Sequence, residues 1–489
     1  MKTSTRACSL LVGLAVGLVG DLARAQELAP ALGIGLPVIG RLTPRAARDI
    51  AASPWSIGGE TLDRDFADYA SYKPYLGPLG AKSIRLQAGW AKCEKRPGVY
   101  DFAWLDAIVD DARAQGVQPW LELSYGNTIY PGGSGVSLST GFPHSPEALA
   151  AWDRWVTALV RHFHDRVSEW EIWNEPDGNK NGMAPAAAYV DLHIRSAAII
   201  RAAQPRARIY ALGLAAKIDY AAAVLAGLKA KGRLDLVDAI TIHGYPHNPD
   251  DTSNIDALRA VIAQFNPSIE VRQGETGAPS RLQPTFALKN LPWSETTQAK
   301  WDLRRLLAHR AKDVPASLFT MSDMRYNWDG ELRLNFKGLL GANPDLTISH
   351  VKAAYRAVQN LFAVFDDTLV RLADYPFACD VPASRRLALT GYAQRGSGRQ
   401  VVALWLNDAP PADENRVIAL DVTLPNASFR EPVLADLRTG LVYRIPPERF
   451  TQTPAGLAFR ALPVYDSPLL LAEAAALPFR RDNLARAPN

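Results

Sequence analysis

The stretch that decides the fold reads EWEIWNEPDG and runs from Glu169 to Gly178. Its first residues are aromatic or β-branched, a composition typical of a buried strand. Pro176 has no backbone N–H to donate, so the strand is expected to stop before it. The sequence therefore places an amide, Asn174, and a carboxylate, Glu175, side by side at the C-terminal end of a strand.

Strand-like segments alternate with amphipathic helical patterns from about Ser53 to Phe365. Such alternation is typical of a parallel sheet, and eight repeats favour a closed (β/α)8 TIM barrel over an open sheet. Long loops follow the third, seventh and eighth strands, on the face where barrel sites are built. The strands are predicted at 55–59, 83–89, 117–123, 169–175, 208–214, 239–245, 269–275 and 316–322.

The sequence pattern changes after Phe365, where strand-like segments with alternating apolar and polar residues follow one another without helical segments between them. This pattern predicts a β-sandwich domain over 366–475, so the fold class is α/β with a C-terminal all-β domain. We expect it to cover apolar barrel surface. The segment 26–52 is less regular and could add a strand to the sandwich, and 476–489 is interpreted as a tail.

The first 25 residues have the layout of a secretory signal peptide. Two basic residues precede an apolar stretch at 11–20, and Ala23-Arg24-Ala25 forms a cleavage site of the A-x-A type. We expect cleavage near Ala25 and export to the periplasm or the exterior. No later segment is long and apolar enough to predict a membrane span.

Composition argues against several functional classes. A net charge of +4 over 489 residues is too small to indicate a nucleic-acid-binding protein. Cys93 and Cys379 are too few for a disulfide scaffold or a metal cluster; they either pair or remain buried free thiols, and free thiols are the simpler interpretation. No histidines have ligand spacing, so we expect neither a metal nor another cofactor. The oligomeric state is not predicted.

Two glutamates mark the chemistry that we expect. Glu175 ends the fourth predicted strand and Glu275 ends the seventh, so a barrel brings both to one rim. Glycoside cleavage needs two facing carboxyl groups, one that protonates the leaving oxygen and one that attacks the anomeric carbon. An acid kept protonated should lie in the drier position, so we expect Glu175 to be less exposed than Glu275.

Three motifs carry a family resemblance. WNEPD at 173–177, HGY at 243–245 and GET at 274–276 resemble glycoside hydrolase clan A. The second-strand text SIRLQAGWAKCEKRPGVYDFAWLDAI and the C-terminal all-β domain resemble family 39, that of β-xylosidases and α-L-iduronidases. The resemblance implies a retaining glycosidase that acts on an oligosaccharide or polysaccharide.

The same resemblance implies roles for four residues. Glu175 resembles the acid/base, Asn174 the amide that binds the sugar 2-OH, Glu275 the nucleophile, and Tyr245 the residue that hydrogen-bonds the nucleophile. A non-catalytic carbohydrate-binding or exopolysaccharide-assembly protein on the same fold is the alternative.

Further candidates follow from position alone. Arg85 in the second strand either holds Glu275 or pairs with a structural carboxylate such as Glu171. His243 ends the sixth strand and is expected near the site. Loop aromatic residues and one amide could bind sugar, although packing is an equal interpretation for each: Trp90, Tyr125, Trp293, Trp328 and Asn127. A uronide would require cations, and the eighth loop offers Arg325 and Lys337.

Overall fold

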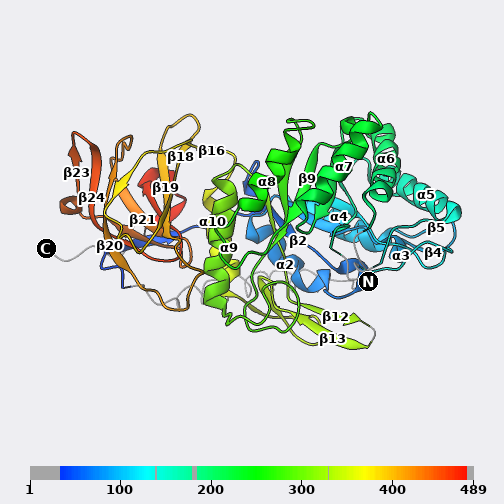
Figure 1. The fold of residues 1–489 in the computed structure, drawn as a ribbon. Helices are drawn as coiled ribbons and strands as arrows, with labels where there is room; N and C mark the ends of the chain where they lie inside the picture. Colours follow the sequence, from blue (N-terminus) through cyan, green and yellow to red (C-terminus); the bar gives the residue numbers. More distant parts are fainter. Residues whose placement is uncertain (1–32, 138–139, 179–183, 329, 482–489) are drawn as a thin grey trace, which may run out of the picture.

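The computed structural model describes residues 33–137, 140–178, 184–328 and 330–481. A barrel and a C-terminal β domain lie side by side (Figure 1). The predicted signal peptide lies outside the described residues.

The barrel contains eight parallel strands, as the sequence predicted. They close in the order β10-β11-β2-β3-β6-β7-β8-β9. Every predicted strand position is occupied, so the TIM-barrel fold is confirmed. Their bounds are β2 (Trp55–Gly58), β3 (Ser83–Gln87), β6 (Gln118–Leu123), β7 (Glu169–Ile172), β8 (Arg208–Leu214), β9 (Ala239–His243), β10 (Glu270–Thr276) and β11 (Ala316–Leu318).

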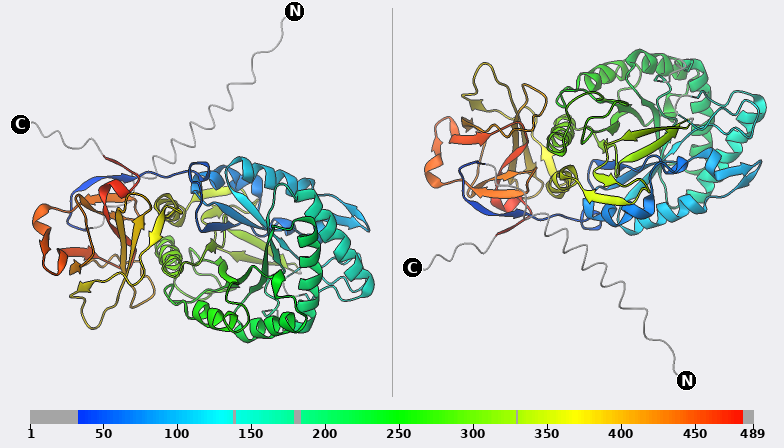
Figure 2. Two further views of the ribbon diagram at one scale, coloured as in Figure 1. Left: turned by 90° about the horizontal axis from the view of Figure 1, so that it is seen from above. Right: turned by 90° about the horizontal axis from the view of Figure 1, so that it is seen from below.

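Helices form an outer ring around these strands (Figure 2). Several of these helices turn an apolar stripe toward the sheet. Three begin at a residue whose side chain accepts a capping hydrogen bond, namely Asp68, Ser145 and Ser294. The Ser145 hydroxyl, for example, accepts a hydrogen bond from the backbone N–H of Ala148. The principal helices are α2 (Tyr69–Leu79), α4 (Ala103–Ala114), α5 (Pro146–Phe163), α6 (Ala186–Ala203), α7 (Ile218–Ala230), α8 (Ser253–Ile262), α9 (Glu295–Arg310) and α10 (Ala353–Val364).

The C-terminal domain consists of two antiparallel sheets that pack face to face. The smaller sheet has the order β17 (Ala378–Cys379), β20 (Ile418–Leu424), β24 (Gly456–Val464) and β23 (Phe450–Thr453). The larger has the order β16 (Leu369–Arg371), β18 (Leu387–Gln394), β19 (Gln400–Leu406), β25 (Leu469–Glu473), β21 (Pro432–Asp436), β22 (Leu441–Arg444), β1 (Val38–Leu42) and β26 (Phe479–Arg481).

Two parts of this domain differ from, or extend, the sequence interpretation. β1 pairs with β22 and β26, so the N-terminal segment does contribute a strand to the larger sheet. β26 lies inside the stretch that was interpreted as a tail, because its three residues are too few for a periodic signal. The segment from 479 to 481 is therefore part of the sheet.

The central strands of the larger sheet are buried on both faces. Along β19, Val402 and Leu404 pack in the core between the two sheets, whereas Val401, Ala403 and Trp405 pack in the barrel's hydrophobic core cluster. α9 and α10 lie between the barrel and this sheet (Figure 1). Successive residues of a strand point to opposite faces, so one strand serves both cores.

Two hairpins in the region that follows β11 were not predicted. They are β12 (Met324–Trp328) with β13 (Glu331–Asn335), and β14 (Leu340–Ala342) with β15 (Ile348–Val351). The first projects from the barrel (Figure 1).

Cys93 and Cys379 are both free thiols. In the described part of the chain, no helix is both long and apolar enough to cross a membrane.

Candidate active site

Glu175 and Glu275 meet at one rim of the barrel. Glu275 is the penultimate residue of β10, and Glu175 follows β7 on a short segment with positive φ angles, 67° at Trp173 and 46° at Glu175. The backbone N–H of Glu175 donates to the carbonyl of Gly213, which helps to hold this left-handed conformation. Carboxylate oxygens of the two glutamates and a ring nitrogen of His243 all lie within 4.8 Å of one another.

The two carboxylates have different surroundings. Glu275 accepts a hydrogen bond of 2.5 Å from the Tyr245 hydroxyl and lies 3.4 Å from Nη1 of Arg85. Glu175 is 2.9 Å from Nδ1 of His243. The expected difference in burial is absent, because the side chain of Glu175 is 18% exposed and that of Glu275 14%. The two groups differ in their partners rather than in their access to water.

His243 lies between both carboxylates. Its Nδ1 is 3.6 Å from Oε2 of Glu275 as well as close to Glu175. Burial lowers the pKa of His243, but the charge of Glu275 and the hydrogen bond to Glu175 outweigh it and raise the pKa to about 9. An imidazolium at this point partly neutralises two neighbouring negative charges.

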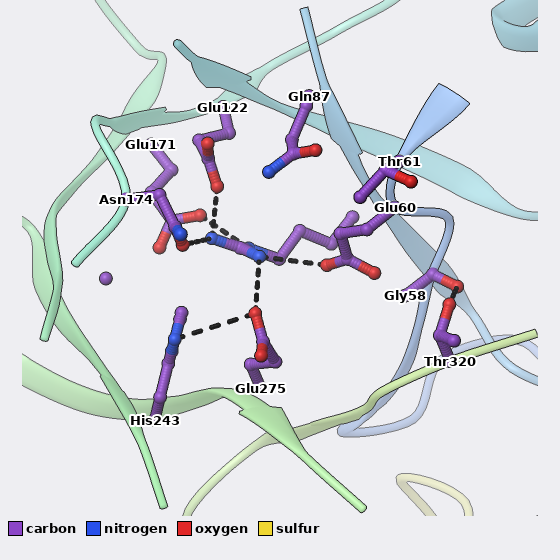
Figure 3. Close-up of polar contacts among 12 residues, drawn as sticks. Gly58, Glu60, Thr61, Gln87, Glu122, Glu171, Asn174, His243, Glu275 and Thr320 are labelled. Atoms are coloured by element: carbon purple, nitrogen blue, oxygen red, sulfur yellow. Dashed lines mark hydrogen bonds and ion pairs between the residues drawn. The ribbon is translucent and has the colours of Figure 1, made fainter. Parts of the chain in front are cut away.

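Arg85 is the centre of a buried polar network that also contacts Glu275. The carboxylates of Glu60, Glu122, Glu171 and Glu275 point toward one another around this centre (Figure 3). Its guanidinium is fully buried and donates to the carboxylates of Glu171, Glu122 and Glu60. It also donates to Oδ1 of Asn174 over 2.8 Å. Both alternatives from the sequence therefore hold: Arg85 contacts Glu275 and pairs with structural carboxylates. It does not line the cavity, so the structure gives it no direct substrate contact.

The network holds more carboxyl groups than cations. Burial raises the pKa of Glu60 to about 7, against the lowering effect of Arg85. Burial also raises the pKa of Glu122 to about 7, again opposed by Arg85. A single arginine thus stabilises several buried acids at the base of the site.

A cavity of about 320 Å³ opens above this network. Asn174 and Tyr125 both contribute to its wall, and Asn174 Nδ2 donates to the Tyr125 hydroxyl over 3.0 Å. Glu175, Tyr245 and Glu275 also reach the cavity. Predicted residues from the third, fourth, sixth and seventh barrel strands and the loops after them therefore converge on one space.

Two predicted sugar ligands lie elsewhere, which corrects the sequence interpretation. Trp90 is fully buried and packs against Trp152 and Trp155. Asn127 is 1% exposed and donates to the backbone carbonyl of Glu94 over 2.9 Å. Both follow barrel strands, but their loops turn the side chains into the protein core. Trp293 is also buried, and the side chain of Trp328 lies outside what the structure describes.

Other residues of the cavity were missed. Gln87 is the last residue of β3 and Glu60 follows β2 by two residues, so the strand-end rule that identified Glu175 would have found them. Arg64, Tyr326 and Asn335 also line the cavity but follow no such rule. Arg64 ends a short 3-10 helix, Leu62–Arg64, and the other two belong to the β12–β13 hairpin. Of the two loop cations, Lys337 lines the cavity and Arg325 does not.

The cluster of Glu175, His243 and Glu275 has the donor set of a metal site. Its three atoms are already engaged with one another through His243 Nδ1. Chemically, the arrangement is suited to proton transfer and nucleophilic attack, with two carboxylates at short range and donors that orient them. The absence of a metal remains an expectation from the sequence.

Comparisons with known proteins support the resemblance to glycoside hydrolases that the sequence motifs indicated. The family model of glycosyl hydrolases family 39 matches residues 89–276, which include both glutamates. A beta-galactosidase of Geobacillus kaustophilus is 29% identical over 104 residues, which are 18% of this chain and 16% of that protein. The chain thus spans only about a sixth of the length of that curated relative.

Solved structures resemble the chain over most of its length. A family 39 glycoside hydrolase of Bacteroides cellulosilyticus matches with a TM-score of 0.60 and 19% identity, covering 86% of this chain and 80% of that one. A monomeric beta-xylosidase of Caulobacter crescentus matches with a TM-score of 0.58 and 18% identity, covering 88% and 97%. The resemblance to clan A, and to family 39 in particular, is confirmed.

Proposed function

We propose that this chain, whose barrel is similar to glycosyl hydrolase family 39, is an exported retaining glycoside hydrolase. The observation that carries the proposal is the carboxylate pair: Glu175 and Glu275 offer oxygens within 4.8 Å of each other at the wall of a cavity. Retaining glycosidases need carboxyl groups about 5–5.5 Å apart, whereas inverting enzymes need roughly 6.5–9.5 Å to admit a water. Export rests on the N-terminal sequence pattern alone.

In the first step, Glu275 attacks the anomeric carbon and the glycosidic C–O bond breaks. Glu175 gives its proton to the departing oxygen, so the leaving group departs as an alcohol and a glycosyl ester forms on Glu275. In the second step, the ionised Glu175 takes a proton from water. The resulting hydroxide attacks the same carbon, breaks the ester bond and restores the carboxylate of Glu275.

The surroundings favour this division of roles. Tyr245 and Arg85 both direct N–H or O–H groups at Glu275, which stabilises its charged form and aims its oxygens. Glu175 lacks such donors apart from His243, so among the described residues it has the weaker support for its negative charge. A group that must alternate between acid and base needs that freedom.

Hydrolysis of a panel of nitrophenyl glycosides tests the activity. We expect release of nitrophenol from at least one pentoside, hexoside or uronide. Silence across the panel together with measurable oligosaccharide binding would favour the non-catalytic carbohydrate-binding alternative.

Azide separates the roles of the two glutamates. In the Glu175→Ala protein, an activated aryl glycoside should still form the ester, and azide should then yield a glycosyl azide of the substrate's anomeric configuration. In the Glu275→Ala protein, azide should occupy the place of the missing carboxylate and give the opposite anomer. Reversed products would exchange the two roles, and full activity of both variants would refute the mechanism.

A further inference from the structure

The segment between β9 and α8, residues 244–252, connects the site to the C-terminal domain. It begins next to His243 and carries Tyr245, whose hydroxyl donates to Glu275. The carbonyl of Gly244 accepts a hydrogen bond of 2.6 Å from Oγ1 of Thr276, the neighbour of Glu275. The segment 244–251 contains neither helix nor strand, so side chains from elsewhere must fix its path.

α9 supplies the first set of these side chains. The indole Nε1 of Trp301 lies 3.2 Å from the carbonyl oxygens of both Pro246 and His247. Arg305 donates through Nη1 to the carbonyls of Pro249 and Asp251. Both side chains are fully buried. Together they donate hydrogen bonds to four backbone carbonyl groups of the segment.

Arg305 shows how strongly this segment is held. Its Nε also reaches Oγ1 of Thr276 over 3.3 Å. Burial lowers the pKa of Arg305 to about 9, and no carboxylate among the described residues forms an ion pair with it. Burying a guanidinium against two carbonyl groups and one hydroxyl group, without an ion pair, is costly, and apolar packing alone does not account for it.

The C-terminal domain supplies the second set, through Asp250. Trp405 of β19 donates from Nε1 to Oδ1 of Asp250 over 2.8 Å. Arg304 of α9 donates from Nε to Oδ2 of the same carboxylate over 2.8 Å. Arg304 also donates to the carbonyl of Ala409, on the loop that follows β19. One carboxylate is therefore shared between the two domains, five residues along the chain from Tyr245.

We propose that the C-terminal domain positions the nucleophile: Trp405, acting through Asp250, holds the segment that keeps Tyr245 against Glu275. The inference rests on the proposed function. Apolar contacts of the larger sheet are enough to join the domains, but they set no direction. The indole N–H and the carboxylate are directional groups, and a shift of Asp250 is passed along five residues to the Tyr245 hydroxyl.

The Trp405→Phe variant tests this role, because phenylalanine keeps an aromatic ring and removes only the N–H. We expect kcat/KM to fall about three- to tenfold with little change in KM, which corresponds to one weakened hydrogen bond in the transition state. The acid limb of the pH profile should move to higher pH, since a donor to ionised Glu275 is weakened. The other groups around Glu275, namely Arg85, His243, Glu60, Glu175 and Lys337, remain in place.

A double-mutant cycle with Tyr245→Phe distinguishes positioning from general stability. If Trp405 acts through Tyr245, then Trp405→Phe should cost almost nothing further in the Tyr245→Phe protein. Trp170→Phe is a matched control, since it removes an indole hydrogen bond to Gln204 near the opposite end of the barrel. The control should change the melting temperature without moving the acid limb.

Equal losses in both backgrounds, or an unmoved acid limb, would overturn the inference and leave the glycosidase proposal intact. A wild-type protein without hydrolytic activity would overturn both. If Trp405→Phe does not fold, Arg304→Lys tests the other link between Asp250 and the C-terminal domain, because it keeps a positive charge near Asp250 but loses the contact to Ala409. The same non-additivity with Tyr245→Phe is expected from it.

Discussion

Nδ1 of His243 lies 2.9 Å from Oε1 of Glu175, and the same nitrogen is 3.6 Å from Oε2 of Glu275. One buried imidazole is thus in contact with both proposed catalytic carboxylates. Because the pKa of His243 is raised to about 9, the ring is cationic at neutral pH and interacts with whichever glutamate is ionised.

Replacing His243 by Gln should shift the pH profile. Glutamine keeps a donor but has no charge, and loss of a cation within about 4 Å raises the pKa of a carboxyl group by roughly one unit or more. Both limbs of the kcat/KM profile should therefore move to higher pH by about one unit. His193→Gln is the control, since this buried histidine of α6 bonds to the backbone carbonyl of Leu236. If neither limb of the kcat/KM profile moved in His243→Gln, the His243 ring would have to be neutral in the wild-type protein.

Replacing Arg85 by Met should destabilise the whole barrel. Glu60, Glu122 and Glu171 would lose their shared cation while staying buried, and breaking such a network costs about 3–5 kcal/mol. Urea unfolding at pH 7 measures the loss. Because Glu60 and Glu122 can take up protons, the loss should shrink at pH 5. A loss of similar size at both pH values would contradict the role assigned to the buried acids.

Replacing Lys337 by Met should stabilise the protein. Burial lowers the pKa of Lys337 to about 7, and among the described residues its ammonium has no ion pair or hydrogen bond. Between pH 7 and 10 the unfolded chain binds this proton and the folded protein does not, so wild-type stability rises with pH there. The gain from Lys337→Met, about 1–3 kcal/mol, should be largest below pH 7 and shrink toward pH 10.

Lys352 offers the matched control for this prediction. It is also buried, but its ammonium lies 2.6 Å from Oδ1 of Asp323. Lys352→Met should therefore lower the melting temperature, because it leaves an unpaired buried carboxylate. Equal effects of the two substitutions would refute the distinction between a paired lysine and an unpaired one.

Replacing Asn127 by Ala should affect stability and not substrate binding. Its amide bridges the carbonyl of Glu94 and the N–H of Ile129, so its loss should cost about 1–3 kcal/mol in the free energy of unfolding. KM for any hydrolysed glycoside should stay within about twofold of wild type. A large rise in KM alone would restore the role in sugar binding that the sequence suggested.

Strand ends explain how far the site could be predicted. Glu175, Glu275 and His243 lie where β-rich segments stop, and in a parallel barrel all such positions share one rim. Trp90 and Asn127 satisfied the same rule and are buried structural residues. The rule locates a backbone position near the rim, but it does not say whether the following loop turns the side chain toward the cavity or into the core.

By itself, the sequence determined the barrel, the all-β domain and the two glutamates. These follow from local periodicity, turn residues and strand ends, which act over a few neighbouring residues. Only the tertiary structure decided that Arg85 joins Glu60, Glu122 and Glu171, that His243 lies between the two glutamates, and that Trp405 reaches Asp250. The physical reason is that such contacts join residues tens to hundreds of positions apart, and barrel closure and domain packing set their distances.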